Sequence, residues 1–454
     1  MNKSLILAMA TLCSLTAAAE GYQVNTFSAR QEGMGHVGVA MKLGAESNIF
    51  NPAGVVMSDK TMDFSAGMSA IMATCTSTYD GNEYTTDNNV STPFNISAAF
   101  SIYDNLSAGI SLYTPYGSSI NWGKNWPGAV LNQSVDLKVF TVQPTVSWRI
   151  IPGLSVGAGL MISWGNVDLN KGLVTAGSLN ALQTLMVAGG QLPGMLHEFV
   201  TTPASVSLSG KSEIALGYNV GVMYDILPNL TFGASYRSKM EMKVKKGDAS
   251  VEYGNEVATA LLGATLDELS TTNFSSAMPC PYVLTFGLAY RPISKLLVSF
   301  DAQLNGWKTY KTLDIEFEGL PEFAQHLTKN YKNAWTYHLG AEYALTNRFD
   351  IRAGLMIDTS PCNKNYYNPE TPGTTKIEPS VGLSFRPVKN LSIDASFMYV
   401  HGVPVKNATG NYEDFLAKKF PAMEPLFGIS PEGSFTADYR LHAVIPAIGL
   451  SYSF

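Results

Sequence analysis

The side chains of this chain best suited to chemistry are charged residues and histidines that strand alternation places on one face. His338 and Glu342 share a face of one predicted strand, and hairpin pairing brings Arg352 of the next strand near them. An acid, a base and an arginine in one layer could form the hydrolytic centre of an enzyme. Other charged residues are predicted to point the same way: Asp301, Arg237, Arg386 and Asp394.

The alternative interpretation of this layer is a set of ion pairs inside a protein. Buried charges need partners, and both signs are available here. The sequence lacks the Gly-x-Ser-x-Gly, phosphate-loop and His-Glu-x-x-His motifs, and its six histidines have no metal-ligand spacing. We therefore expect a paired polar layer and no enzyme, cofactor or metal.

The elements that position these residues are repeated hairpins. Six short turns rich in Asn, Pro and Gly each join two alternating runs of about ten residues, as at residues 103–106, 225–230 and 386–391. One further run precedes the hairpins and another follows them, which gives about fourteen strands. The predicted strands are residues 61–74, 94–103, 106–116, 134–149, 154–169, 211–225, 230–245, 282–291, 296–317, 334–345, 349–359, 376–386, 391–401 and 437–454.

An even number of antiparallel strands with short turns at one end and long loops at the other is typical of a bacterial outer-membrane barrel. Along residues 349–359 the apolar side chains alternate with Asp350, Arg352 and Asp358, so we expect the apolar set to face lipid and the polar set the lumen. The C-terminal Phe454 ends an alternating strand, which resembles the signal that such barrels present to their assembly machinery.

Composition supports this class. The 454 residues are 46% hydrophobic and only 15% charged, with a net charge of -6 and no basic cluster that would indicate a nucleic-acid partner. No segment of the mature chain is apolar over the roughly eighteen residues that a membrane helix needs. A chain that faces lipid without such helices must satisfy its backbone in a closed barrel.

The N-terminus predicts two further segments. Residues 1–19 have the charge, apolar core and small-residue cleavage site of a secretory signal peptide. Residues 20–58 are rich in glycine and in apolar residues, so we expect a small hatch inside the barrel that spans residues 59–454, rather than a disordered tail. Cys13 lies in the signal peptide. The three cysteines of the mature chain, Cys75, Cys280 and Cys362, either form one disulfide or remain free thiols.

The long loops carry apolar residues at helical spacing. They are predicted either to pack on one another over the barrel mouth or to form an exposed landing site for a hydrophobic ligand, and both can hold together. The candidate ligand-binding residues in these loops are Leu182, Leu185, Met186, Phe415, Phe420 and Phe427.

Four motifs in order resemble the FadL/TodX family of outer-membrane transporters. Asn51-Pro52-Ala53 follows the Gly33-Met34-Gly35 turn and resembles the plug of that family. The hairpin of residues 335–355, the Asp-x-Ser-Pro strand exit at 358–361 and the strand exit at 399–402 are also similar. The resemblance covers nearly the whole mature chain.

The resemblance implies a fourteen-stranded barrel closed by a hatch, with uptake of long-chain fatty acids or other hydrophobic molecules. Ligand would enter between the loops, bind beside the hatch, and leave sideways into the membrane through a kink in the third strand. The hatch residues would be Gly33, Gly35 and Asn51-Pro52-Ala53, with the last three against the kink. The kink region would include Tyr113, Pro115 and Gly117.

The chain departs from the family where the fatty-acid transporters place basic residues. Residues 164–167 contain no cation, and on the predicted ninth strand alternation points Lys308 to lipid and Lys311 to the lumen, near Trp307. Trp307 and Lys311 are therefore the candidate ligand residues of the lumen, and a neutral hydrocarbon remains an alternative ligand.

The sequence thus predicts a monomeric uptake channel of the bacterial outer membrane, in contact with membrane lipid and with a hydrophobic small molecule as its ligand. The alternatives are a barrel that acts as a receptor or adhesin through its loops, and a barrel enzyme that acts on lipid.

Overall fold

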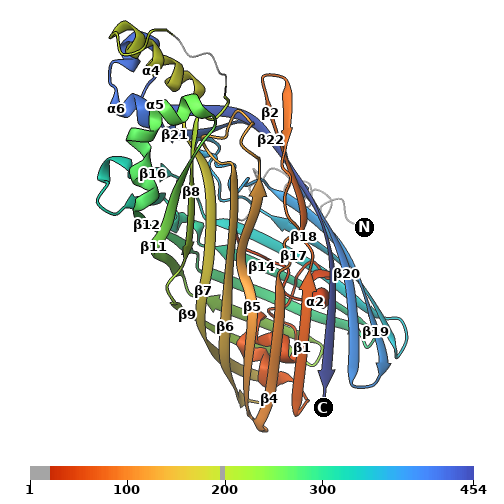
Figure 1. The fold of residues 1–454 in the computed structure, drawn as a ribbon. Helices are drawn as coiled ribbons and strands as arrows, with labels where there is room; N and C mark the ends of the chain where they lie inside the picture. Colours follow the sequence, from red (N-terminus) through yellow and green to blue (C-terminus); the bar gives the residue numbers. More distant parts are fainter. Residues whose placement is uncertain (1–20, 195–199) are drawn as a thin grey trace.

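The computed structural model describes residues 21–194 and 200–454, and its strands form one antiparallel sheet closed into a barrel (Figure 1). The sheet contains 22 labelled strands, which make a ring of fourteen because several ring members are interrupted. The ring closes where β1 pairs with both β4 and the C-terminal β22. The predicted all-β barrel is confirmed, and the predicted signal peptide lies outside the described residues.

The strands and helices have the following bounds. The strands are β1 Met62–Ser69, β2 Met72–Tyr79, β3 Asn82–Thr85, β4 Phe94–Tyr103, β5 Leu106–Asn121, β6 Ser134–Ile151, β7 Leu154–Val174, β8 Ala204–Lys211, β9 Ala215–Leu227, β10 Leu230–Arg237, β11 Met240–Tyr253, β12 Asn273–Cys280, β13 Val283–Ile293, β14 Leu296–Asn305, β15 Thr312–Phe317, β16 Gln325–Thr328, β17 Ala334–Ala344, β18 Phe349–Asp358, β19 Lys376–Val388, β20 Leu391–Gly402, β21 Val405–Glu413 and β22 Glu432–Ser453. The helices are α2 Ala29–Glu32, η2 Gly44–Glu46, α3 Ser47–Phe50, η3 Pro52–Met57, α4 Ala176–Ala188, α5 Glu256–Leu266, η4 Asp267–Thr271, η5 Trp307–Thr309, η6 Pro321–Phe323, η7 Lys364–Tyr366, α6 Phe415–Lys419 and α7 Met423–Phe427.

Several predicted boundaries are wrong on the side of the long loops. The expected loop 246–281 contains the end of β11 and all of β12, and the expected loop 402–436 contains β21 and the start of β22. The predicted ninth strand, residues 296–317, is interrupted between β14 and β15. These extensions rise above the lipid, so no face of them has to be apolar over its full length, although β15 and the start of β22 still alternate in burial.

Within the wall, the predicted faces are confirmed. Along β18, Phe349, Ile351 and Ile357 are exposed, whereas Asp350 and Arg352 are buried. Along β20, Asp394, Ser396 and Met398 are buried and their neighbours are exposed or half-buried. The apolar side chains therefore face lipid, and the polar ones face the lumen.

These faces predict the effect of a charge at two adjacent positions of β18. Leu355→Arg is expected to lower the free energy of unfolding by about 2–4 kcal/mol, because the half-exposed Leu355 faces lipid. Met356→Arg is expected to cost less, because Met356 lies inside the barrel opposite Glu378. Heat-modifiable migration of the refolded proteins measures the difference, and equal losses would show that the faces are reversed.

The segment before the barrel lies inside the ring (Figure 1). The turn η3 packs against β6, β7 and β9, and α2 packs against β19 and β20. Most of the apolar residues between Tyr22 and Met57 are buried, as a filling segment requires. None of the helices among the described residues is long and apolar enough to span a membrane.

The structure distinguishes between the two alternatives for the cysteines, one disulfide or free thiols. Cys75, Cys280 and Cys362 are free thiols in the structure, and Cys75 and Cys280 are buried in different apolar clusters. Of these two alternatives, the structure has the free thiols.

Candidate functional site

The extracellular end carries an apolar cluster formed by three loop helices. Helix α4, capped at its start by the Thr175 hydroxyl, contacts α6 and α7. The predicted residues Leu182, Leu185, Met186, Phe415 and Phe420 all belong to this cluster. Phe427 and Leu426 at its edge remain 38% and 63% exposed. The helices therefore pack together at the barrel mouth, as one interpretation of the loops predicts (Figure 1). Apolar side chains at the edge of the cluster remain exposed, and their role as a landing site for a hydrophobic ligand stays a prediction.

Below this cluster, the lumen holds a small apolar cavity of about 50 Å³ between β6, β7, β11 and β12. Its wall is made almost entirely of inward-facing aliphatic and aromatic side chains, so a water molecule in this cavity would find few hydrogen-bond partners. The lining includes Leu137, Val139, Leu208, Met242, Val244, Phe274, Met278 and Ile315.

Aromatic rings form the lower boundary of this apolar region. Trp307 is completely buried, and its ring centroid lies 4.8 Å from that of Tyr22, the first ring of the N-terminal segment. Tyr310 and Tyr116 approach Tyr22 at 6.0 Å and 6.1 Å. Burial raises the pKa of the Tyr22 phenol well above its usual value, so the group stays protonated and donates to the Pro279 carbonyl.

The prediction that Lys311 points into the lumen is wrong. The chain leaves β14 at Asn305, and the turn η5 breaks the alternation, so Lys311 is exposed while Trp307 is buried. Among the described residues, the buried lysines are Lys171, which donates to the Gln325 amide oxygen at 2.8 Å, and Lys329, which pairs with Glu370. Sequence reasoning missed both because they lie in stretches assigned to loops.

The third ring strand is disrupted where the kink was predicted. β5 pairs with β4 only as far as Tyr113, opposite Asn95. In the pairing of β5 with β6, the register shifts between Tyr113 and Tyr116, which is the signature of a bulge. Beyond this point, β5 continues to Asn121 without β4 beside it, so its edge lacks a wall partner.

The N-terminal segment occupies that edge. The Val24 amide donates to the Pro115 carbonyl at 2.9 Å, and the Gly117 amide donates to the Tyr22 carbonyl at 2.9 Å. Gln23 and Tyr116 form the antiparallel bridge between them. Residues 22–24 of the N-terminal segment therefore take the place of β4 along this part of β5.

A cavity of about 530 Å³ lies beside this edge, in the size range of small-molecule sites. Its lining includes inward-facing Met356 and Val400 and outward-facing Lys138 and Phe140. The loop of residues 86–93 lies at its outer side, and Ile71 and Ser91 form a bridge there. The cavity therefore crosses the wall between the lumen and the outer surface.

The Asn51-Pro52-Ala53 turn does not lie against the kink, and that prediction is wrong. The Asn51 side-chain amide donates to Val39 and Val222 carbonyls at 2.7 Å and 3.0 Å. The Ala53 carbonyl accepts from the hydroxyls of Ser147 and Ser155 on β6 and β7. The turn fixes the segment near the short-turn end. Residues 22–24 form the backbone hydrogen bonds to the kink region, and Phe27 packs against Tyr113.

The two predicted glycines allow a close approach of the segment to the wall. A Cβ on Gly33 would lie 2.8 Å from Gly382 Cα. Gly35 has a φ of +63°, and a Cβ there would lie 2.7 Å from Leu355 N. Larger residues would push the segment away from β18 and β19.

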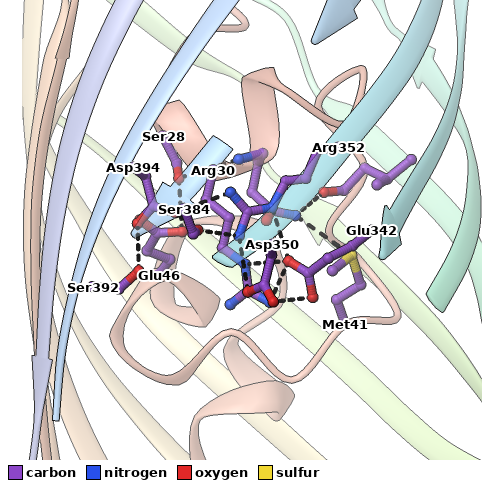
Figure 2. A network of polar contacts seen from close by, with 12 residues as sticks. Ser28, Arg30, Met41, Glu46, Glu342, Asp350, Arg352, Ser384, Ser392 and Asp394 are labelled. Atoms are coloured by element: carbon purple, nitrogen blue, oxygen red, sulfur yellow. Dashed lines mark hydrogen bonds and ion pairs between the residues drawn. The ribbon is translucent and has the colours of Figure 1, made fainter. Parts of the chain in front are cut away.

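Figure 2 shows how the predicted polar layer joins the segment to the wall. Arg352 donates to Glu342 at 2.8 Å and to Asp394 at 2.9 Å. Arg30 of α2 also donates to Glu342, at 3.0–3.2 Å. His338 donates to the Gly35 carbonyl at 2.8 Å. The layer is thus a set of ion pairs and hydrogen bonds that fixes the segment from Arg30 onward.

The other charged residues of the layer also have fixed partners. Asp301 accepts from the Gly38 and Val39 amides, Arg237 donates to the Ile49 carbonyl, and Arg386 pairs with Asp350. Within the described residues, no group of three or more His, Cys, Asp or Glu side chains is placed to hold a metal ion.

A fourteen-stranded lipid-facing barrel filled by its own N-terminal segment, with a cavity through its wall, defines the class of plugged outer-membrane channels. The chain belongs to the family described as outer membrane protein transport protein (OMPP1/FadL/TodX), which matches residues 10–454. It is therefore a transport protein of the bacterial outer membrane and not an enzyme.

Individual relatives are distant in sequence and similar over their full length. The chain is 23% identical to the long-chain fatty acid transport protein of Escherichia coli K12 over 431 residues, which cover 91% of this chain and 94% of that protein. A Pseudomonas aeruginosa FadL homologue has a TM-score of 0.75 at 18% identity, covering 96% of this chain and all of that one. The Pseudomonas putida toluene transporter TodX has a TM-score of 0.66 at 16% identity, with the same coverage.

Proposed function

We propose that this channel takes up hydrophobic small molecules, captures them at the loop helices and releases them sideways through the wall at β5. The names of its relatives include transporters of long-chain fatty acids and of toluene, so the class of ligand is apolar in both cases. Such molecules partition into the bilayer, because moving each methylene from water into an apolar environment lowers the free energy by about 0.8 kcal/mol.

Capture rests on the apolar cluster of α4, α6 and α7. The exposed Leu426 and Phe427 offer a first contact, and the buried members of the same cluster continue into the lumen. The cluster includes Tyr22 and Trp307, so one continuous apolar surface reaches from the loops to the start of the N-terminal segment.

The observation that carries the proposal is the pairing of residues 22–24 with β5. These residues close the wall where β4 ends, and the cavity that crosses the wall lies directly beside them. Movement of residues 22–24 would open the cavity to ligand from above. Residues 20–58 then act as a hatch of which only the part before Arg30 moves, since Arg30 and the residues after it are anchored by the polar layer.

A substitution that fills the exit tests this function. Ala443 is buried on β22 and lines the wall-crossing cavity. Ala443→Trp is expected to lower uptake of radiolabelled oleate and toluene by about tenfold or more, because the added ring occupies the space that ligand must pass.

Ala395→Trp is the matched control, because Ala395 is exposed on the lipid face of β20. Both variants are first checked for heat-modifiable migration. Normal uptake by a folded Ala443→Trp protein would rule out this exit.

Two partner assignments complete the proposal. We infer that the barrel works as a monomer and is recognised by the assembly machinery through Phe454. This side chain is 56% exposed beside Phe64 of β1, where the ring closes.

A further inference from the structure

The wall-crossing cavity contains one acidic side chain that its own protein neighbours leave without a direct partner. Glu378 on β19 is 3% exposed and points inward, opposite Met356. Among the described residues, no hydrogen bond or ion pair reaches its carboxyl group, although Glu378 lines the cavity. A buried carboxyl without a hydrogen bond is destabilising, so its presence in a ligand path requires a reason.

The surroundings of Glu378 are apolar. It borders the cluster of Met356, Met398, Val400, Ala443 and Ile445, and all of these except Met398 line the same cavity. A hydrophobic ligand in the cavity would therefore lie along this surface with any polar end near Glu378.

The other charges of the cavity are matched in pairs. Lys138 binds Asp136 at 2.9 Å near the outer side, and Lys376 binds Asp358 at 3.2 Å. Lys376 also attracts Glu378 electrostatically, while Asp358 and Glu32 of the N-terminal segment repel it. Glu32 itself is held by the hydroxyls of Ser69 and Ser396. The cavity thus has one carboxyl group more than it has ammonium groups.

We propose that Glu378 selects the ligand's polar end: it accepts a hydrogen bond from a hydrophobic alcohol, phenol or amine and disfavours a carboxylate. The inference rests on the proposed function and narrows its substrate class. A ligand hydroxyl supplies the donor that the protein does not, whereas a fatty-acid carboxylate would add a second negative charge in the same low-dielectric space.

Binding of four twelve-carbon probes to the purified full-length protein in detergent tests the proposal. Dodecan-1-ol, dodecylamine, dodecanoate and dodecane compete at pH 9.5, where the carboxyl group of Glu378 is ionised, with the neutral fluorophore N-phenyl-1-naphthylamine. The alcohol is expected to bind about tenfold more tightly than dodecanoate, the ratio that one hydrogen bond to a charged group provides.

Two variants assign the preference to Glu378. Glu378→Gln keeps the shape and removes the charge, so dodecanoate is expected to bind within about threefold of the alcohol. Glu378→Met removes the acceptor, so the alcohol is expected to bind no more tightly than dodecane. Glu241→Gln, at an exposed position of β11, is the control and should preserve the wild-type order.

The outcomes separate this inference from the function on which it rests. If dodecanoate binds the wild-type protein as tightly as the alcohol, or if Glu378→Met preserves the preference for the alcohol over dodecane, the role of Glu378 is wrong while the channel stands. If neither the fluorophore nor any twelve-carbon probe binds, the proposed function itself fails. Heat-modifiable migration of each variant excludes misfolding as the cause.

Discussion

The double variant Val24→Cys/Gly117→Cys is expected to lose uptake when oxidised and to recover it when reduced. A Cβ placed on Gly117 would lie 3.8 Å from Val24 Cγ2, so the side chains of residues 24 and 117 meet on the same face and a small shift brings two sulfur atoms within bonding distance. The bond would hold residues 22–24 against β5 and keep the wall closed. Gly117 is not in the left-handed region, and its nearest backbone neighbour, the Leu137 carbonyl oxygen at 3.1 Å, needs only a slight shift.

The measurement is uptake of radiolabelled toluene or oleate by cells that carry the variant, before and after addition of dithiothreitol. The two single variants serve as controls and should transport under both conditions. Mass spectrometry of the oxidised protein establishes the fraction that is cross-linked. Normal uptake by the fully cross-linked protein would show that ligand does not leave through this edge.

The second large effect is expected from Arg352→Met. Arg352 is 5% exposed and binds two carboxylates that are themselves buried, Glu342 and Asp394. Removal of one partner from a buried ion pair typically costs about 3–5 kcal/mol, because an unpaired charge remains in a low-dielectric site. Urea unfolding in detergent is expected to show a loss of that size.

A compensating variant distinguishes the charge effect from a packing effect. Asp394→Asn added to Arg352→Met removes the carboxylate that is left without a cationic partner and should restore part of the loss, while Glu342 keeps its pair with Arg30. Lys418→Met breaks an exposed pair with Glu413 and should cost much less. A loss from Arg352→Met no larger than that from Lys418→Met would contradict the anchoring role of the layer.

The parts of the fold that could be predicted are those where lipid and lumen impose opposite demands. Along β18, a lipid-facing isoleucine and a lumen-facing arginine cannot exchange places, so alternation identifies both the strand and its faces. Above the membrane that demand ends, and β12 and β21 were therefore missed. The family resemblance predicts a kink in the region of Tyr113, Pro115 and Gly117, and the structure has a register shift between Tyr113 and Tyr116.

The positions of the candidate site residues could be predicted only where strand alternation applies. Alternation places Trp307 inside the barrel, where the structure also buries it, although its role as a ligand residue stays a prediction. The placement of Lys311 is wrong because the turn η5 resets the alternation two residues before it. The position of Asn51 depends on how a segment without periodicity folds inside the barrel, and only its bonds to Val39 and Val222 reveal it. Glu378 alternates correctly in sequence, but the lack of a bonding partner is a three-dimensional property.

The bridge between Gln23 and Tyr116 also determines the resting state of the channel. When residues 22–24 leave β5, the amide of Gly117 and the carbonyl of Pro115 lose their partners at a membrane-facing wall, where each unsatisfied group costs several kcal/mol. In the proposed mechanism the open form is therefore a high-energy state that recloses unaided, and a ligand must offset its cost by binding it better than the closed form. A barrel gated in this way would behave as a self-closing valve, which keeps the outer membrane tight whenever no ligand is passing.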